Sequence, residues 1–393
     1  MKAEWAYIPF EDVCVSMTKG PFGSDIKKSL FVPKSADTYK VYIQVNAIEK
    51  DVTLGEYYIT REYFDSKMSR FEVKPGDYII TCDGTLGRYL RLPQTMERGI
   101  ISASLLRLTL KTNIFPRFFE YLWDGYLMPR LTSDIRNSAL VHLPSATKIG
   151  KVLIPLPSLA EQSQIASELD LLSGIIDKQK AQLIELDTLS QAIFYDMFGD
   201  PVENEKGWNV KPLGELCIVV RGGSPRPIEQ YLGGTIPWIK IGDATKGDDI
   251  YLHQTKEHIL ESGLRKTRFI HSGSLIFANC GVSLGFARII TFDGCIHDGW
   301  LAFDNISEEI DKVFLLKSLN FCTSYFRRIA PDGTQPNLNT SIMKSFLQII
   351  PPLPVQKNYV EKIQSIEKQK ETINKAIKET QALFDYTMDK YFG

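Results

Sequence analysis

Residues 159–198 read LAEQSQIASELDLLSGIIDKQKAQLIELDTLSQAIFYDMF, and the spacing of their apolar residues indicates how the chain is built. It contains no proline and one glycine, and its apolar residues recur at alternating steps of four and three, with Gln179 and Ser190 interrupting the row. That spacing is typical of a coiled-coil seam and is narrower than the apolar stripe of a helix lying on a globular core. At about 1.5 Å per residue, such a helix is about 60 Å long, and its seam needs a partner.

A partner for this helix is present in the same chain. Residues 359–391 carry a second row with steps of three and four, and each stretch follows Pro-Leu-Pro and ends at Phe-Gly. Proline before a helix and glycine after it are start and stop signals. We therefore predict two long antiparallel helices that form a coiled-coil spacer. The predicted interface consists of Ile165, Leu169, Leu172, Ile176, Leu183, Leu186, Ile363, Ile366, Ile373, Ile377 and Phe384.

The two stretches are also related as sequences. Residues 177–183 (DKQKAQL) match residues 367–373 (EKQKETI), and residues 191–194 match residues 381–384, both pairs being separated by 190 positions. A shared separation indicates an internal duplication, in preference to two unrelated helices.

The duplication extends into the rest of the chain. Residues 5–14 and 208–217 share Trp-x3-Pro-[Phe/Leu]-x-[Asp/Glu]-[Val/Leu]-Cys. We predict a mixed α/β fold with two homologous α/β units, each followed by a long helix. Strands are expected at 41–45, 78–81, 105–110, 238–241, 275–278 and 287–291, and aromatic-rich helices at 115–127 and 312–329. The predicted segments are 1–154 (first unit), 155–199 (first helix), 200–207 (polar linker), 208–351 (second unit) and 352–393 (second helix).

Composition limits the function classes. The chain of 393 residues is 44% hydrophobic and has a net charge of −1, which argues against a non-specific nucleic-acid coat. Residues 158–206 carry 3 Lys+Arg against 10 Asp+Glu, so the first helix suits protein docking, or plain solvation, better than DNA. We find no signal peptide and no membrane-length apolar run, and we expect a cytoplasmic protein. Six cysteines without a C-x-x-C pair and five histidines predict reduced core thiols and no zinc site.

Catalytic signatures are missing from the sequence. There is no G-x-x-x-x-G-K-[ST] phosphate loop, no Asn/Asp-Pro-Pro-aromatic motif of amino methyltransferases and no glycine-rich turn suited to S-adenosylmethionine. Glu72-Val73-Lys74 is an E-x-K without the preceding acidic partner of a metal nuclease. We therefore predict no catalytic residues and no metal site in this chain.

Four polar, glycine-punctuated loops occur at corresponding places in both halves. Their Arg, Asn and Gln side chains suit base edges, and their Lys, Ser and Thr side chains suit phosphates, although polar loops are often merely solvated. The candidate DNA-binding residues are Lys19, Ser24, Lys27, Lys28, Gln44, Asn46, Asp83, Thr85, Arg88, Arg136, Asn137 and His142 in the first half, and Arg221, Ser224, Arg226, Lys240, Asp243, Asn279, Ser283, Thr334, Gln335, Asn337 in the second.

The order of unit, Pro-Leu-Pro helix with Glu161-Gln162, linker, unit and Pro-Leu-Pro helix resembles the specificity (S) subunit of type I restriction–modification enzymes. The repeated Trp-x3-Pro start and the segment GTQPNL at 333–338 carry the resemblance too, which spans essentially the whole chain. The first half departs from it with SALVHL at 138–143, and the second helix has Val355-Gln356 in place of Leu-x-Glu-Gln.

The resemblance implies that the units are target recognition domains and that the helices are spacers. Each domain would bind one half of an asymmetric, bipartite double-stranded DNA target, because the loops differ between the halves. Two modification subunits would dock on the helices and bring S-adenosylmethionine, and restriction subunits would bring ATP and Mg. The chain itself would hold no cofactor. Two other classes stay open: an adaptor with two ligand-binding units unrelated to DNA, and a self-sufficient methyltransferase or nuclease.

Overall fold

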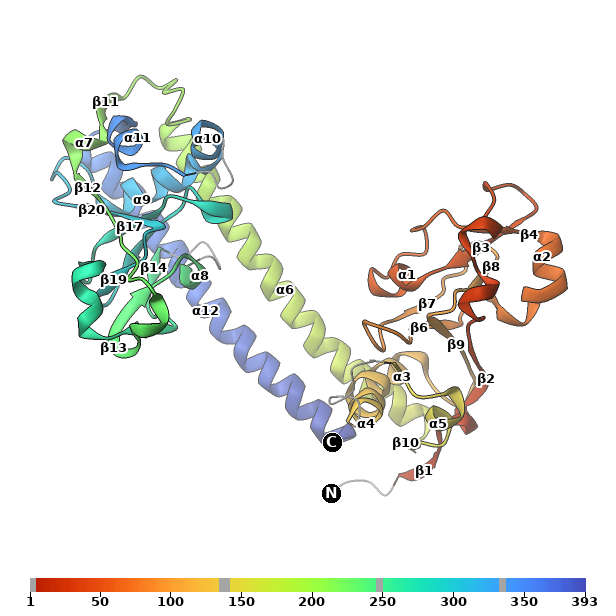
Figure 1. The fold of residues 1–393 in the computed structure, drawn as a ribbon. Coiled ribbons are helices and arrows are strands. Elements are labelled where there is room, and N and C mark those ends of the chain that lie inside the picture. The colour runs from red at the N-terminus through yellow and green to blue at the C-terminus, as the bar shows by residue number, and fades with distance from the viewer. Residues whose placement is uncertain (1–4, 134–141, 245–249, 332–336) are drawn as a thin grey trace. The chain divides into compact units, whose positions relative to one another are not determined.

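The computed structural model describes residues 5–133, 142–244, 250–331 and 337–393, whose elements are labelled in Figure 1. The chain forms two compact units. Unit 1 consists of Met1–Asp177 with Lys378–Gly393, and unit 2 of Lys178–Ile377. Each unit therefore contains one part of both long helices, α6 (Leu159–Phe198) and α12 (Leu353–Phe392).

Unit 1 contains three small sheets with the strand orders β2-β9-β6-β7, β4-β3-β8-β5 and β1-β10. All neighbours are antiparallel except β3 and β8, which run parallel. The strands are β1 (Ala6–Pro9), β2 (Cys14–Lys19), β3 (Thr38–Tyr42), β4 (Tyr58–Thr60), β5 (Glu72–Val73), β6 (Tyr78–Thr81), β7 (Tyr89–Arg91), β8 (Gly99–Ile101), β9 (Leu105–Leu110) and β10 (Leu153–Leu156). Its short helices are α1 (Gln44–Ile48), α2 (Arg61–Tyr63), α3 (Pro116–Leu122), α4 (Met128–Thr132) and α5 (Ala146–Gly150).

Unit 2 repeats this topology with one added strand, β14, at the edge of its largest sheet; its strand orders are β12-β20-β17-β18-β14, β15-β13-β19-β16 and β11-β21. Its parallel pairs are β13 with β19 and β14 with β18. The strands are β11 (Asn209–Pro212), β12 (Ile218–Arg221), β13 (Leu232–Ile239), β14 (Tyr251–Leu252), β15 (Glu257–Ile259), β16 (Arg268–Ile270), β17 (Leu275–Ala278), β18 (Ala287–Ile290), β19 (Gly294–Ile296), β20 (Trp300–Asp304) and β21 (Leu347–Ile350). The short helices are α7 (Leu213–Leu216), α8 (Ile241–Ala244), α9 (Lys312–Phe321), α10 (Thr323–Ile329) and α11 (Thr340–Ser345).

The predicted duplication and mixed α/β fold are confirmed, with two local corrections. Residues 41–45 and 238–241 were predicted as strands, but each strand ends sooner and a short helix follows, α1 in unit 1 and α8 in unit 2. In both, a side chain three residues on accepts a backbone N–H and turns the chain: Ile43 donates to Asn46 Oδ1, and Lys240 to Asp243 Oδ2, each at 2.8 Å.

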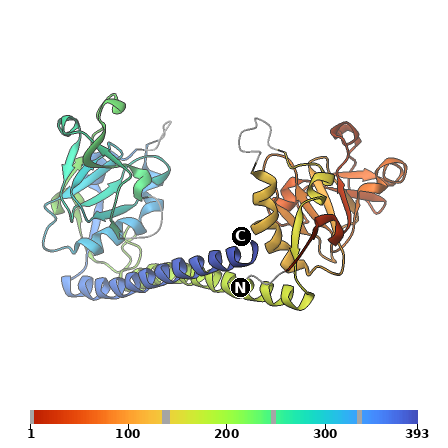
Figure 2. The ribbon, with the colours of Figure 1, turned by 90° about the horizontal axis from the view of Figure 1, so that it is seen from below.

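The two long helices pack against each other within each unit. In unit 1, the Tyr391 hydroxyl near the end of α12 donates to Glu168 near the start of α6, at 2.7 Å. In unit 2, Lys370 in the first half of α12 meets Asp187 in the second half of α6, at 2.7 Å. The start of one helix thus meets the end of the other, which confirms the antiparallel pairing. In Figure 2, the sheets of each unit lie to one side of the helix segments that belong to it.

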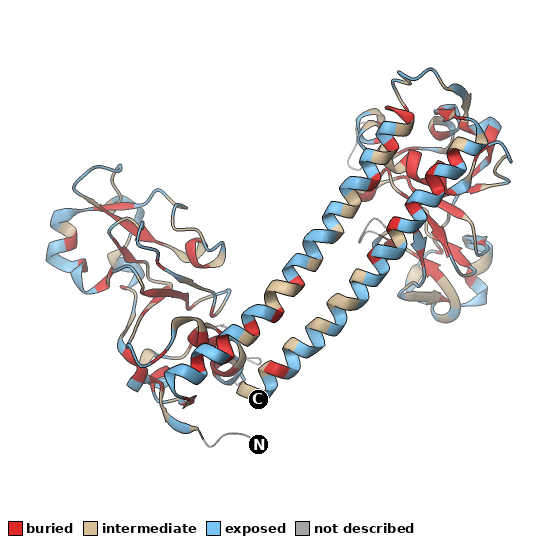
Figure 3. Cartoon of the chain, turned by 180° about the vertical axis from the view of Figure 1, so that it is seen from behind, coloured by how far each residue is buried: buried red, intermediate tan, exposed pale blue. Residues whose placement is uncertain are grey.

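The ends of the two long helices are part of the hydrophobic cores of the units. Ile165 and Leu169 of α6 join the unit 1 core, with Phe384, Met388 and Phe392 of α12. At the other ends, Ile363 and Ile366 join the unit 2 core with Phe194 and Phe198. Leu172 and Ile176 are buried, whereas Leu183, Leu186, Ile373, Ile377 and Phe384 are half-buried. The helix ends thus pack as broad faces on the cores of their units. A narrow seam remains only in the middle turns, where Figure 3 shows few buried residues (red).

The structural repeat of the helices has a different spacing from the sequence matches. The helices begin at Leu159 and Leu353 and end at Phe198 and Phe392, so equivalent positions lie 194 residues apart. The two terminal phenylalanines pack on Phe118 and Phe314, which hold corresponding places in α3 and α9. The matches 190 residues apart therefore do not pair structurally equivalent positions. None of the helices among the described residues is long and apolar enough to cross a membrane.

Candidate nucleic-acid interface

The strand order brings three of the four predicted loops together in unit 1. β2 and β6 both run antiparallel to β9, and their last residues, Lys19 and Thr81, pair with Leu106 and Leu105 at its start. The segments after β2 and after β6 therefore leave the sheet at the same edge. β3 ends beside β8, and the Ser102 N–H that follows β8 donates to the Tyr42 carbonyl at 2.8 Å. The turn 102–104 between β8 and β9 thus joins the edges of both sheets and places Gln44 beside the other loops.

The fourth loop is held to the third by a short bridge in each unit. Asp83 pairs with His142, and Cys280 pairs with Asn337. A second backbone bond follows each bridge at 2.8 Å, from Leu143 N–H to the Cys82 carbonyl and from Leu338 N–H to the Asn279 carbonyl. The described end of each fourth loop, at His142 and Asn337, therefore lies beside the third loop of its unit.

Loop cluster 1 consists of Lys19, Gln44, Asp83 and His142. Gln44 donates to the Asp83 carbonyl at 3.1 Å, and His142 Nδ1 lies 2.6 Å from Asp83 Oδ1. Burial raises the pKa of the neighbouring Cys82 to about 12, while the positive charge of Lys19 lowers it and Asp83 raises it. Lys19 and His142 are exposed, and Asp83 and Gln44 are half-buried, so the cluster faces solvent.

Loop cluster 2 consists of Arg221, Ser224, Arg226, Lys240, His297 and Asp298. Arg221 Nε donates to the Asp298 carbonyl at 3.0 Å, and Ser224 donates to Asp298 Oδ1 at 2.8 Å. Arg226 Nη2 lies 3.9 Å from Asp298 Oδ2. The backbone N–H of His297 donates to the Ile239 carbonyl at 3.0 Å, which places this histidine beside Lys240. Asp298 thus holds this loop in two ways: its backbone carbonyl accepts from Arg221, and its carboxylate accepts from Ser224 and attracts Arg226.

His297 is held in its neutral form. Burial lowers the pKa of His297; the charges of Arg226, Lys240 and Arg221 lower it further, and Asp298 acts in the opposite direction. The Gly299 N–H donates to Nδ1 at 2.9 Å, so Nδ1 is an acceptor and the ring proton sits on Nε2. Nε2 lies 3.0 Å from Asp298 Oδ1 and donates to it.

Four predicted contact residues prove to have structural roles in this conformation. Asn46 is fully buried, and its amide group donates to the carbonyls of Asp51 and Leu54. Asp243 caps its turn and also accepts from Thr255. Asn279 is fully buried and donates to Asn337 and Leu338, and Ser283 is 6% exposed. Short polar side chains beside a glycine turn serve the backbone as readily as a ligand, which is why the sequence pattern did not separate the two roles.

The other predicted residues are spread around the clusters. Ser24, Lys27 and Lys28 are exposed on a segment in which the Asp25 carbonyl accepts from Tyr63 at the end of α2, away from the loop cluster. Thr85 and Arg88 are exposed, and the charge of Arg88 acts on Asp124 beyond α3. Arg136, Asn137, Thr334 and Gln335 lie outside the described residues, and Asn337 accepts from Asn279 at 3.0 Å.

Two members of loop cluster 2 were missed in the sequence. His297 and Asp298 lie in the turn between β19 and β20, and the corresponding turn in unit 1 reads Ser102-Ala-Ser104. The candidate loops are those that recur in both halves, and the His297-Asp298 pair has no counterpart in the first half. The polar dipeptide between two apolar strands, 294–296 and 300–304, was the available clue.

The described residues offer no metal centre. No group of three or more His, Cys, Asp or Glu side chains in 5–133, 142–244, 250–331 and 337–393 is arranged to hold a metal ion. All six cysteines are free, and Cys280 in the turn of cluster 2 is the one that is not buried.

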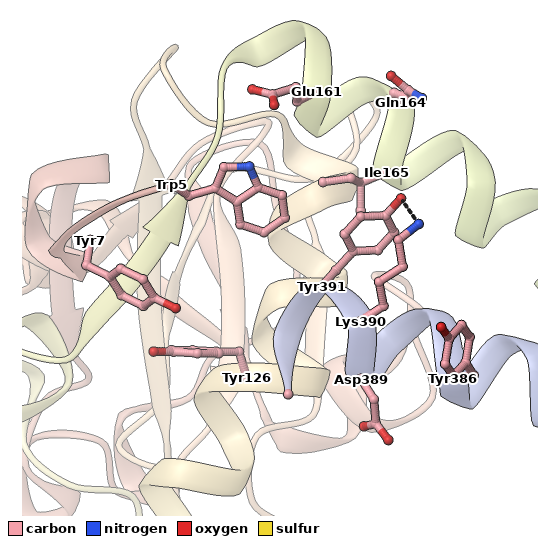
Figure 4. Close-up of a pocket in the computed structure, with 11 residues that line it drawn as sticks. Trp5, Tyr7, Tyr126, Glu161, Gln164, Ile165, Tyr386, Asp389, Lys390 and Tyr391 are labelled. Carbon is pink, nitrogen blue, oxygen red and sulfur yellow. Dashed lines mark hydrogen bonds between the residues drawn. The ribbon is translucent and has the colours of Figure 1, made fainter. Parts of the chain in front are cut away.

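A separate hollow lies at the helix ends of unit 1. It has a volume of about 750 Å³, and its lining includes Trp5, Tyr7 and Tyr126 of the α/β part and Tyr386 and Tyr391 of α12. Figure 4 shows the Trp5 and Tyr391 rings facing each other, and their centroids are 6.1 Å apart. Tyr386 is 68% exposed, so an aromatic surface remains open to solvent here.

Residues 3–186 and 205–380 match the family model of the type I restriction modification DNA specificity domain. The chain is 25% identical over 276 residues to the type I restriction enzyme MjaIX specificity subunit of Methanocaldococcus jannaschii, covering 65% of this chain and 63% of that protein. It is 24% identical to the MjaVIII specificity subunit of the same organism over 84% of this chain and 86% of the relative. The EcoKI specificity subunit of Escherichia coli K12 is 24% identical over 67% of this chain and 61% of its own length.

Solved structures share the fold. A chain solved in work on complex assembly and conformational transition of the type I R-M system superposes with a TM-score of 0.66 at 20% identity, covering 99% of this chain and 97% of that one. The type I restriction-modification S subunit from M. genitalium has a TM-score of 0.54 at 15% identity and covers 99% and 96%.

Proposed function

The chain belongs to the family of type I restriction–modification DNA specificity proteins, and on that premise we propose that its two loop clusters read the two halves of a split DNA target. By family, a specificity subunit is not itself catalytic and holds no cofactor. The observation that supports the proposal is that, in both units, the first residues of three predicted loops and the described end of the fourth meet at one edge of the sheets.

The two half-sites should differ in sequence. Lys19 and Arg221 end equivalent strands, so a cation stands at the same place in both units. Around it, Asp83 of unit 1 corresponds to Cys280, and the turn Ser102–Ser104 corresponds to His297–Gly299. Because hydrogen-bond donors and acceptors determine which bases are accepted, two different clusters imply an asymmetric target. We propose residues 1–154 and 208–351 as the two target recognition domains.

We propose that modification subunits dock on the long helices. Large apolar side chains lie exposed along them, with Leu171 66%, Ile184 68% and Tyr386 68% exposed. Large exposed apolar side chains with a polar rim around them are typical of a protein interface. The aromatic hollow in Figure 4 lies at the helix ends of unit 1, and we include it in the proposed docking site.

The chemistry would come from the partners. Modification subunits would supply S-adenosylmethionine and flip the target base, and restriction subunits would supply ATP- and Mg-dependent cleavage. A cytoplasmic location, where the chromosome is accessible, is part of the same proposal.

The test is methylome sequencing of a host that carries this chain with its modification subunit, compared with a deletion of this chain alone. Loss of methylation at one split, asymmetric motif upon deletion is the expected result. Unchanged methylation would overturn the proposal and favour an adaptor unrelated to DNA, for which the assembled complex would fail to bind any duplex.

A further inference from the structure

Each loop cluster contains a carboxylate among cationic or polar side chains. Asp83 lies in the cluster of Lys19, and Asp298 lies between Arg221 and Arg226. A carboxylate at a DNA-binding edge repels the phosphate backbone, so it weakens binding unless it meets a hydrogen-bond donor on the DNA. A carboxylate in both clusters therefore suits a target that offers a hydrogen-bond donor to each of them.

The two carboxylates are held in the same way. A histidine nitrogen fixes one oxygen: His142 Nδ1 is 2.6 Å from Asp83 Oδ1, and His297 Nε2 is 3.0 Å from Asp298 Oδ1. Ser224 also donates to Asp298 Oδ1. Among the described residues, the second oxygen of each carboxylate receives no hydrogen bond; only Arg226 approaches Asp298 Oδ2, at 3.9 Å. Each pair thus presents one oriented, open acceptor.

The carboxylates are partly accessible: the Asp83 side chain is 28% exposed and that of Asp298 is 37% exposed. An ionised carboxylate only accepts hydrogen bonds, and the donors on major-groove base edges are the exocyclic amino groups of cytosine and adenine. Phosphates and guanine O6 and N7 offer no donor to it. An open carboxylate oxygen can therefore accept a hydrogen bond from a base amino group, but not from the acceptor atoms of the groove or from phosphates.

We propose that Asp83 and Asp298 are specificity-determining residues, each of which accepts a hydrogen bond from the exocyclic amino group of one cytosine or adenine in its own half-site. This inference rests on the proposed reading of a split DNA target. His142 and His297 are positioning residues that orient the carboxylates. Because Asp83 follows β6 whereas Asp298 lies in the β19–β20 turn, the two bases occupy different places within their half-sites.

The test compares the methylome motif of the wild-type complex with those of Asp83→Asn and Asp298→Asn. Asparagine keeps the shape and one acceptor but adds a donor and removes the charge. We expect each variant to accept a second base pair at one position of one half-site, with about a tenfold loss of discrimination there. The other half-site should keep its sequence, and affinity for non-cognate duplex should rise because a negative charge is gone.

A matched control exists in unit 2. Asp293 Oδ2 lies 3.3 Å from His271 Nδ1, so this is also an aspartate–histidine pair, but it lies at the opposite end of β19 from Asp298. Asp293→Asn should leave the motif and the affinity as in the wild type.

The outcomes separate this inference from the function on which it rests. If the wild-type complex yields no split motif, the proposed function fails and the inference with it. If the wild type yields a motif that both variants preserve at every position, whether methylation stays full or falls uniformly, the inference is wrong and the proposed function stands. Relaxation of the motif in Asp293→Asn would also contradict it.

Discussion

Lys370 of α12 reaches Asp187 of α6, with Nζ 2.7 Å from Oδ1, although Lys370 is only 6% exposed. The same ammonium lies 3.7 Å from Glu367, whose other oxygen is 3.2 Å from buried Lys317 of α9. The pair therefore belongs to a chain of alternating charges that links both long helices to the aromatic-rich helix of unit 2. The equivalent of Lys370 in unit 1 is Ile176, so this network exists in one unit only.

Replacing Lys370 should destabilise unit 2. A buried ion pair contributes little beyond its desolvation cost, but removal of one partner leaves an uncompensated charge. Lys370→Met should lower the free energy of unfolding by about 1 kcal/mol, as measured by urea denaturation, because the Asp187 left behind is 35% exposed and Glu367 keeps Lys317. Asp187→Asn combined with Lys370→Met should recover part of the loss, and exposed Lys368→Met should stay within about 0.5 kcal/mol of the wild type. Equal effects of the two lysine changes would show that the network does not matter.

The sequence alone predicted the parts of the fold that depend on periodicity. The long helices, the strands at 78–81, 105–110 and 275–278, and the duplication follow from hydrophobic spacing and recurring motifs. It did not predict that α1 and α8 end their strands early, because that depends on the side chains of Asn46 and Asp243 bonding to the backbone. The four loops stay a prediction as DNA contacts, and the sequence did not show which of their described side chains face solvent, since tertiary contacts decide that.

Two glutamines anchor the long helices to the α/β parts and can be tested as a pair. Gln162 is fully buried, accepts from Phe115 N–H at 2.6 Å and donates to the carbonyls of Asn113 and Pro157. Gln356 makes the same three bonds, with Asp311 N–H and the carbonyls of Glu309 and Pro351.

Leucine at either position leaves one backbone N–H and two carbonyls without their hydrogen-bond partner. Gln162→Leu or Gln356→Leu should therefore lower the free energy of unfolding by about 3 kcal/mol. Exposed Gln364→Leu on α12 is the control and should be nearly neutral. The measurement is again urea denaturation. A loss below about 1 kcal/mol in both buried variants would contradict the anchoring role.

Lys19 and Arg221 should contribute electrostatic affinity from opposite half-sites. Lys19→Ala and Arg221→Ala should each weaken binding of the cognate duplex by about tenfold, and the salt dependence of binding should become shallower by about one unit. Lys74→Ala is the matched control, because Lys74 is exposed near the opposite end of β6 from the cluster. Fluorescence anisotropy over a salt series with the assembled complex measures both quantities. A Lys74 effect as large as the others would indicate diffuse attraction in place of a defined site.

The exposed apolar side chains of α6 should matter for assembly and not for folding. Ile184 is 68% exposed, so Ile184→Asp should leave the free energy of unfolding within about 0.5 kcal/mol of the wild type. The same change should weaken association with modification subunits by at least tenfold, because it places a charge in an apolar interface. Ala181→Asp, also exposed on α6, tests whether any added charge has this effect. Size-exclusion chromatography of the mixed subunits gives the outcome, and a full complex with Ile184→Asp would remove this surface from the interface.

Cysteine reactivity provides a direct probe of loop cluster 2. Burial raises the pKa of Cys14, Cys217 and Cys322 to about 12, so these thiols should resist alkylation of the folded chain. Cys280 is half-buried, and burial first and then the charge of Asp298 raise its pKa while Arg221 lowers it. Because a raised pKa means less thiolate at neutral pH, labelling of Cys280 by iodoacetamide should be slow at pH 7 and accelerate toward pH 10. Mass spectrometry should find Cys280 modified first, cognate duplex should protect it, and Asp298→Asn should accelerate labelling at pH 8. Labelling that is indifferent to bound duplex would show that DNA does not cover this cluster.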